Sequence, residues 1–191
     1  MKSTMPTKDM TKTMFAEAII ELLNHVPFKK ITVTMLANHC RVPRQTFYYH
    51  FHDKYELVNW IYSSDLNKVM AENANESWSK VTSLFFQKLN EKRAFYKKVL
   101  MDSGQNSLLE HSQTYPANLF LASLSQGAQA PVMKDLQFSL NYHAYACSNM
   151  TRHWLLSEPH VTPEEQNDRT LRAMPQMLYD KLNGYREKEQ V

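Results

Sequence analysis

Hydrophobic residues in the first third of the chain recur at three- and four-residue steps, in short runs separated by prolines and capping residues. This spacing is typical of helices that bury one face. We expect a first helix over about residues 9–25, ended by Pro27. Thr32, whose hydroxyl can accept an unpaired backbone N–H, begins a second helix. Pro43 begins a third, of about two turns, and Asp53 caps a longer fourth.

The remainder of the chain is patterned in the same way, so the predicted fold class is all-α. We expect the later helices over about residues 77–89, 92–100, 116–125, 131–157 and 163–182, with loops at 102–106 and 127–131. Pro175 lies inside the last of these patterns. Because proline removes a backbone donor and crowds the preceding turn, we expect a kink or an irregular turn there.

The helix that begins at Pro131 carries a stripe of residues whose spacing alternates strictly between three and four. Its members are Met133, Leu136, Leu140, His143, Cys147, Met150 and Trp154. Such a stripe, called the heptad stripe below, is typical of a helix packed lengthwise on other helices. The pattern leaves two interpretations open, a partner in a second copy of the chain or a partner in the chain's own core.

Composition supports a helical, globular protein. The 191 residues include only three glycines, and 43% are hydrophobic against 21% charged. Apolar runs long enough to span a membrane and an apolar N-terminal signal segment are lacking, so we expect a cytoplasmic protein without membrane partners. Cys40 and Cys147 fall in apolar helical patterns, which predicts reduced thiols.

Positive charge is concentrated near the N-terminus. Of the 22 Lys and Arg and 19 Asp and Glu, residues 1–60 hold eight and five, which leaves fourteen of each for the rest. The whole excess of +3 therefore lies in the first third of the chain, where the short helices are predicted.

Those short helices and their tight connections indicate a helix-turn-helix. In the segment CRVPRQTFYYHF, a turn of 100° per residue places Phe47 and Phe51 on one side, which we expect to be buried. Tyr49 points the opposite way, flanked by Gln45 and Thr46. The third helix would thus expose a polar and aromatic face.

This face suits double-stranded DNA. Arg44 can pair with guanine and Gln45 with adenine in the major groove, and Thr46 can offer its methyl to thymine. Stiff side chains with polar tips suit contacts to phosphates or groove walls. The predicted DNA-contacting set is Lys29, Thr32, Thr34, Arg44, Gln45, Thr46, Tyr48, Tyr49, His50 and Lys54, with Lys54 placed to bind a phosphate where the fourth helix begins.

The segment FKKITVTMLANHCRVPRQTFYYHFHDKYELV, residues 28–58, resembles the DNA-binding domain of TetR-family transcriptional regulators. The shared features include the Tyr48-x-His50-Phe51 signature and Lys54 before Glu56-Leu57. PRQTFYYHF also resembles a subgroup that includes activators of dihydroxyacetone kinase operons. The resemblance implies a DNA-binding domain at residues 1–54 and a helical effector-binding and dimerisation domain at 55–191.

Two residues depart from the family pattern. Arg41 stands where the family usually has a glycine in the turn, and Pro43 where it usually has a serine cap. Arg41 is therefore expected to adopt a left-handed or adjusted turn at some cost. Pro43 supplies a fixed φ in place of a capping hydroxyl.

The resemblance also implies a homodimer on a palindromic operator, with the last two long helices pairing with their copies. The predicted dimer interface comprises Leu136, Leu140, His143, Cys147, Met150, Trp154, Leu171, Met174 and Leu178. The aromatic residues expected to line an effector pocket are Tyr62, Phe86, Phe95, Tyr115, Phe120 and Tyr145, with plain core packing as the alternative.

The predicted function is a ligand-responsive repressor that binds operator DNA, with an unidentified small-molecule or protein effector and no cofactor. An activator of a small metabolic operon and a metal-responsive regulator are the alternatives. For the latter, His143 and Cys147 stand four residues apart, with His111, His153 and His160 as further ligands. No phosphate-binding loop, nucleophile elbow or HExxH pair occurs, so an enzyme is not expected. A helical scaffold protein is the remaining rival, and it predicts no salt-dependent DNA binding.

Overall fold

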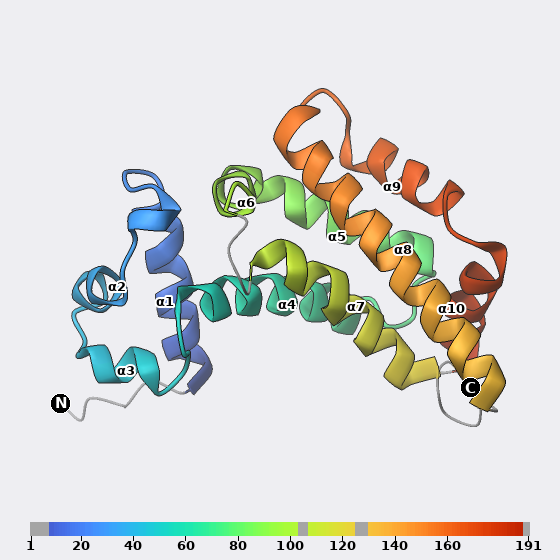
Figure 1. Ribbon diagram of the computed structural model, residues 1–191, viewed down its shortest axis with the longest axis horizontal. Helices are drawn as coiled ribbons and strands as arrows, with labels where there is room; N and C mark the ends of the chain where they lie inside the picture. The colour runs from blue at the N-terminus through green and yellow to red at the C-terminus, as the bar shows by residue number, and fades with distance from the viewer. Residues whose placement is uncertain (1–7, 103–106, 125–129, 189–191) are drawn as a thin grey trace.

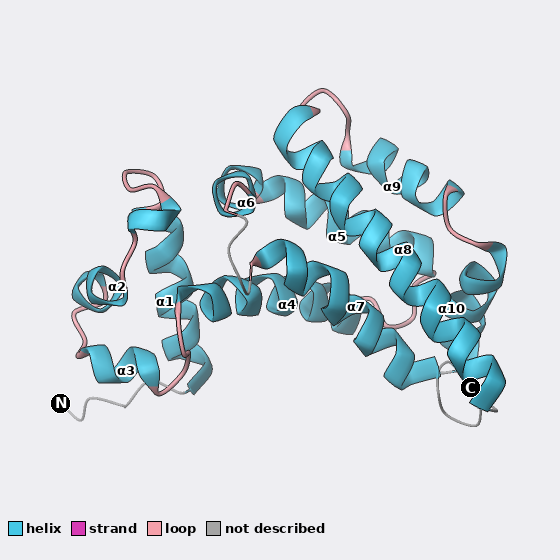
Figure 2. Ribbon diagram, viewed as in Figure 1, coloured by secondary structure: helices cyan, strands magenta, loops and turns pink. Residues whose placement is uncertain are grey.

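The computed structural model describes residues 8–102, 107–124 and 130–188. Over these ranges every regular element is helical, as Figure 2 shows, which confirms the all-α prediction. The elements are α1 (Lys8–Leu22), the 3₁₀ turn η1 (Phe28–Lys30), α2 (Val33–His39), α3 (Arg44–Tyr48), α4 (Lys54–Glu72), α5 (Trp78–Glu91), α6 (Arg93–Leu100), α7 (Leu108–Leu124), α8 (Ala130–Ser157), α9 (Pro163–Arg172) and α10 (Gln176–Lys188).

Helices α1, α2 and α3 form one end of the molecule, here called the head (Figure 1). The predicted caps are present: the Thr32 hydroxyl accepts the backbone N–H of Met35, and the Asp53 carboxylate accepts that of Glu56. Helix α3 is shorter than the two turns predicted, since it ends at Tyr48. The chain continues as a tight turn in which the N–H of Phe51 donates to the carbonyl of Phe47 at 2.9 Å.

Helix α4 runs from the head into the remainder of the molecule (Figure 1). It packs on α1 at one end and on α5 and α7 along its length. Because α4 contacts both parts, a displacement of this helix relative to α5 or α7 would also displace the head.

The remaining helices form a bundle in which α7 packs on α8, and α5 packs on α9. The sequence predicted that α7 would begin at Pro116, but it begins at Leu108 and contains Pro116 inside the helix. The predicted break at Pro175 is confirmed, since α9 ends at Arg172 and α10 begins at Gln176. Parts of the two predicted loops, residues 103–106 and 127–129, lie outside the described residues.

The hydrophobic core continues from the head into the bundle. One cluster of buried residues includes Phe15 and Phe47 of the head together with Tyr62, Tyr96 and Trp154 of α4, α6 and α8. A second cluster joins α5, α7, α8 and α10. The expected boundary between residues 54 and 55 therefore coincides with the start of α4 but not with a gap in the core, and the division into domains stays a prediction.

Two further sequence expectations concern the cysteines and the membrane. Cys40 and Cys147 are free thiols, as expected. Within the described ranges, no helix has the length and apolar character that crossing a bilayer requires.

Candidate DNA-binding surface and effector pocket

Helix α3 is fixed to the head by the two phenylalanines that the sequence predicted to be buried. Phe47 is 0% exposed and Phe51 is 2% exposed. The ring of Phe47 meets that of Phe15 on α1 edge to face, with centroids 5.1 Å apart. Contacts of this kind hold a short helix that could not persist alone, since so few residues give little intrinsic helix stability.

The opposite side of α3 is exposed, as predicted. Arg44, Gln45 and Tyr49 face solvent, and Tyr49 is 78% exposed. The guanidinium of Arg44 donates to the hydroxyl of Tyr48 at 3.2 Å, so these two side chains support each other across one turn. Large apolar rings are rarely left this open without a partner, which marks the face as an interaction surface.

Other members of the predicted set flank this face. Lys29, Thr32 and Thr34 are exposed on η1 and the start of α2, and Thr46 is half-buried. His50 is also half-buried, and burial together with the nearby Lys12 and Lys8 lowers its pKa. A neutral imidazole is therefore the form that His50 presents at neutral pH.

Lys54 does not have the role that the sequence suggested. Its ammonium donates to the carbonyl oxygens of Phe28 at 2.7 Å, Lys29 at 3.1 Å and Ile31 at 3.0 Å. A lysine ammonium has three N–H donors, and all three are used within the head. The prediction that Lys54 binds a phosphate is thus corrected: this side chain ties α4 to the carbonyl end of η1.

The turn between α2 and α3 shows the strain expected at Arg41. Its φ is 55°, the one positive value at a non-glycine residue among the described residues. Pro43 occupies the N-cap position of α3 with no side-chain hydrogen bond to the helix. Both departures from the family pattern therefore have the local effects that their chemistry predicts.

A cavity of about 140 Å³ lies between α4, α5, α6, α7, α8 and the α9–α10 segment. Three of the six aromatics predicted to line an effector pocket line this cavity, namely Tyr62, Phe86 and Phe120. Its wall also includes Trp78, Phe85, Tyr96, Leu140, His143, Cys147 and Arg152, which were not assigned to the pocket. We call this cavity the effector pocket.

The other three predicted pocket residues lie elsewhere. Phe95 is buried in the core beside Tyr96, with ring centroids 5.0 Å apart. Tyr115 lines an open polar cleft between α4 and α7, where its hydroxyl donates to Asn67 at 2.9 Å. Tyr145 is 49% exposed on the outside of α8. Their contact with an effector stays a prediction, and aromatic character by itself does not specify which side of a helix faces a cavity.

The missed pocket residues on α5 had a signal in the sequence. Trp78, Val81, Phe85 and Leu89 recur at steps of three and four, so they lie on one face of the helix. These side chains pack against neighbouring helices and also line the effector pocket. The spacing of these residues in the sequence identifies the buried face of α5. The position of the cavity along that face depends on the helices that pack against it.

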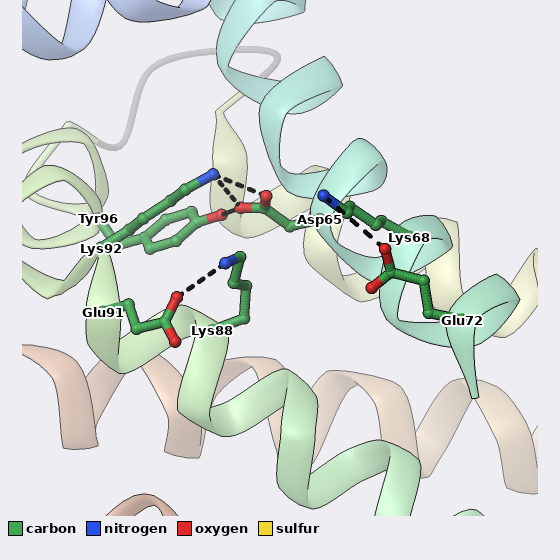
Figure 3. A network of polar contacts seen from close by, with 7 residues as sticks. All are labelled: Asp65, Lys68, Glu72, Lys88, Glu91, Lys92 and Tyr96. Atoms are coloured by element: carbon green, nitrogen blue, oxygen red, sulfur yellow. Dashed lines mark hydrogen bonds and ion pairs between the residues drawn. The ribbon is translucent and has the colours of Figure 1, made fainter. Parts of the chain in front are cut away.

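A polar network joins the pocket wall to α4 (Figure 3). The carboxylate of Asp65 accepts from the ammonium of Lys92 at 2.6 and 2.8 Å and from the hydroxyl of Tyr96 at 2.9 Å. Asp65 is buried on α4, Lys92 lies between α5 and α6, and Tyr96 lines the effector pocket. Charge-assisted hydrogen bonds of this kind are strong and directional, so they fix α4 against the junction of α5 and α6.

His143 and Cys147 form a contact inside the effector pocket, with Nε2 and Sγ 3.1 Å apart. Burial lowers the pKa of His143 and raises that of Cys147 to about 12, which favours the neutral imidazole and the neutral thiol. In the part of the chain that the structure describes, no group of three or more His, Cys, Asp or Glu side chains is placed to hold a metal ion. His111 instead contacts the Ser63 hydroxyl, and His153 pairs with Glu158.

The heptad stripe packs inside the chain. Leu136, Leu140 and Trp154 are buried, and His143 and Cys147 line the effector pocket. On the C-terminal segment Leu178 is buried, while Leu171 and Met174 also line the pocket. The four buried residues leave almost no surface for a second copy, because neighbouring parts of the same chain cover them, and their assignment to a dimer interface is corrected. The assignment of His143, Cys147, Leu171 and Met174 stays a prediction.

Helix α8 leaves a different face exposed. Phe138 is 72% exposed and Tyr142 is 68% exposed, and their rings stack with centroids 6.3 Å apart. Tyr145 continues this face toward the C-terminal end of α8. Met150, 55% exposed, belongs to the heptad stripe and lies on a different side of the helix from Phe138 and Tyr142.

The comparisons with protein families match both parts of the chain. Residues 16–61 match the model for bacterial regulatory proteins of the tetR family, and residues 76–176 match a transcriptional regulator C-terminal region of TetR type. The second match alone covers more than half of the 191 residues. The chain belongs to the TetR family of transcriptional regulators. Its members are DNA-binding regulators and not enzymes, which confirms the prediction against catalysis.

Among curated proteins, the chain is similar to the HTH-type dhaKLM operon transcriptional activator DhaS of Lactococcus lactis subsp. lactis (strain IL1403). The two are 27% identical over 93 residues, which are 48% of this chain and 50% of the relative. The alignment thus spans half the length of that TetR-type activator.

Three solved structures share the fold. The dihydroxyacetone kinase operon activator DhaS has a TM-score of 0.60 at 19% identity, covering 91% of this chain and 97% of that one. A TetR regulator from Streptococcus agalactiae 2603V has a TM-score of 0.60 at 17% identity, covering 90% and 94%. Thermus thermophilus FadR, a repressor in complex with lauroyl-CoA, has a TM-score of 0.52 at 18% identity, covering 85% and 92%. At these identities the likeness concerns the TetR fold alone.

Proposed function

We propose that this TetR-family chain is a ligand-responsive repressor that binds a palindromic operator as a homodimer. The observation that carries the DNA-binding part is the exposed face of α3, where Arg44, Gln45 and Tyr49 project from a helix anchored by Phe47. Arginine and glutamine are the side chains that pair bidentately with guanine and adenine in the major groove.

The homodimer part is supported by the exposed face of α8. Phe138, Tyr142 and Tyr145 form an apolar and aromatic surface along one side of the 28-residue helix. Such a surface costs free energy in water, and a second copy crossing it would bury it. A two-fold dimer would present two α3 helices about one turn of DNA apart, which requires a palindromic operator.

The response to ligand is supported by the position of the effector pocket. Tyr62 and Leu66 of α4 line it, and α4 begins where the head ends. A ligand that favours a different placement of α4 would change the separation of the two heads and hence the affinity for the operator. The effector must bind one of the two arrangements more tightly for this to occur.

An activator of a metabolic operon is the second candidate. The similarity to DhaS, a transcriptional activator, favours it. The two functions share the operator contacts and differ in the effect on the polymerase. In vitro transcription from the protein's own operator separates them, because a repressor lowers transcript yield and an activator raises it.

Selection of bound sequences from random DNA tests the proposal directly. We expect the parent chain to enrich a palindrome, and Gln45→Ala to relax specificity at one base pair of each half-site by roughly 1–3 kcal/mol. Thr13→Ala on α1, away from the exposed face of α3, is the control and should leave the enriched sequence unchanged. Enrichment of no sequence, or the same sequence preference in Gln45→Ala, would contradict the assignment of this face.

A further inference from the structure

The wall of the effector pocket restricts the chemistry of a guest. Aromatic rings of Trp78, Phe85, Phe86 and Phe120 and the aliphatic side chains around them form most of it. A guest that carries charges or many polar groups would lose its water in such a place without replacement. An apolar ligand has no hydrogen bonds to water to lose, and it gains van der Waals contacts with the aromatic rings.

The volume of the pocket restricts the size. The cavity measures about 140 Å³, and an apolar cavity of about 150 Å³ in another protein stays dry and binds benzene. This is the size of a single ring with a short substituent.

Charge on the described wall comes from a single side chain, which the protein itself already engages in part. Among the described residues that line the pocket, Arg152 is the only charged one. Its Nε donates to the carbonyl of Leu100 at 3.2 Å, at the C-terminal end of α6. Helix carbonyls at that end carry partial negative charge, so one of the five N–H donors of Arg152 has a structural partner.

The polar groups of the pocket wall differ in how much of their hydrogen-bonding capacity is already used within the protein. The hydroxyl of Ser112 donates to the carbonyl of Leu109 and that of Ser148 to the carbonyl of Ser112, each at 2.8 Å. His143 and Cys147 instead contact each other through Nε2 and Sγ. Whichever of the two donates, the second ring nitrogen of the neutral imidazole can still form a hydrogen bond with a guest.

We propose that the effector is a small, uncharged and mostly apolar molecule with a single ring, whose one polar group hydrogen-bonds to the His143–Cys147 pair. The inference rests on the proposed function, in which the pocket receives the effector. Benzyl alcohol has this size and chemistry and serves as the probe.

Calorimetric titration of the full chain compares benzyl alcohol with benzoate, which has the same ring and an added charge. We expect benzyl alcohol to bind at least about ten-fold more tightly, because the mostly apolar wall would remove water from a carboxylate and replace it at most through Arg152. Tighter binding of benzoate that is lost in Arg152→Gln would overturn the proposal in favour of an acid. Tight binding of dodecanoate would overturn the size limit, and no binding of benzyl alcohol would overturn the ligand class.

Two variants locate the guest. His143→Phe should weaken benzyl alcohol by about three- to ten-fold and leave toluene unchanged, because only the alcohol uses the hydrogen bond. Ala144→Leu fills part of the cavity and should abolish both. If Ala144→Leu does not fold, the comparison of benzyl alcohol with toluene in His143→Phe still tests the proposed hydrogen bond. Equal losses for the alcohol and toluene in His143→Phe would contradict the proposed hydrogen bond.

Operator affinity measured in the same samples separates this inference from the proposed function. Binding of benzyl alcohol with no change in operator affinity would contradict a ligand-responsive regulator and leave the ligand class intact. Normal operator binding without any binding of benzyl alcohol would contradict the proposed ligand class and leave the proposed DNA-binding function intact.

Discussion

At the scale of single residues, the DNA-facing side of the head depends on contacts that lie behind it. Phe47 and Phe51 hold α3, and Lys54 joins α4 to η1 through three backbone carbonyls. Burial lowers the pKa of Lys54, while the nearby Asp102 and Asp53 act in the opposite direction. The residues proposed to contact DNA and the residues that position them are therefore different, although both kinds fall within one short motif.

Replacement of Lys54 tests this distinction. Lys54→Met leaves three carbonyls without their donor and should lower the free energy of unfolding by roughly 1–3 kcal/mol, measured by urea denaturation. The slope of operator affinity against salt concentration should stay as in the parent chain. The matched variant Lys29→Gln should lower that slope by about one and leave stability nearly unchanged. A reduced salt slope in Lys54→Met would restore the role of a phosphate contact.

The strained turn at Arg41 can be tested separately from its charge. A left-handed conformation costs a non-glycine residue roughly 1–2 kcal/mol. Glycine avoids this cost, but it loses more conformational entropy on folding, so only part of the free energy is regained. Arg41→Gly should therefore stabilise the chain by up to about 1 kcal/mol, measured by thermal denaturation. Arg41→Ala keeps the strain and removes the charge, so it should give no such gain. Equal effects of both variants would show that the backbone angle is not the cause.

At the scale of elements, α4 is the structure that both the head and the effector pocket contact. The short hydrogen bonds from Lys92 and Tyr96 to Asp65 hold its middle, and Tyr62 and Leu66 on either side of Asp65 line the pocket. A guest that displaces Tyr96 would stretch a charge-assisted network in addition to moving an apolar ring. This geometry gives the pocket a direct physical connection to the helix that carries the head.

Substitution at Asp65 should reveal this connection. Asp65→Asn leaves the Lys92 ammonium without a charged partner and should cost roughly 1–3 kcal/mol of stability. It should also reduce the change in operator affinity that benzyl alcohol produces in the parent chain. Tyr96→Phe keeps the ring and removes one hydrogen bond, so its effect on stability should be about 1 kcal/mol. An unchanged ligand response in both variants would show that the network has only a structural role.

At the scale of the whole molecule, the core is shared between the head and the bundle, and the exposed face of α8 is the large apolar surface outside the head. Phe138 and Tyr142 stack on each other there without cover from the described part of the chain. A homodimer through this face would place the effector pocket of each copy beside the interface, since His143 and Cys147 lie on the other side of the same helix.

The dimer is tested by placing a charge on this face. Tyr142→Asp should shift the protein from dimer to monomer in sedimentation velocity, because two buried carboxylates would face the interface. The stability of the single chain should change little, since Tyr142 is mostly exposed. Met101→Asp, an exposed apolar residue at the end of α6, is the control and should remain dimeric. A dimer that persists in Tyr142→Asp would exclude this face.

The local pattern of the sequence was sufficient for most of the helices, for their caps and for the exposed face of α3, although it misplaced the start of α7. Thr32 and Asp53 act on N–H groups three residues away, and the sides of α3 follow from a fixed turn per residue, so no distant contact is needed to predict them. The break at Pro175 and the positive φ of Arg41 are equally local, because they follow from the covalent structure of one residue and its turn.

Only the tertiary structure decided what each buried face meets. The heptad stripe has the period of a packed helix, but the period is the same whether the neighbour is α7 of the same chain or a second copy, and packing within the chain was realised. Lys54 is long enough to reach either a phosphate or the carbonyls of η1, and the fold of the head selected the carbonyls. The effector pocket arises where six segments fail to fill the space between them, a property of their joint packing that no single segment specifies.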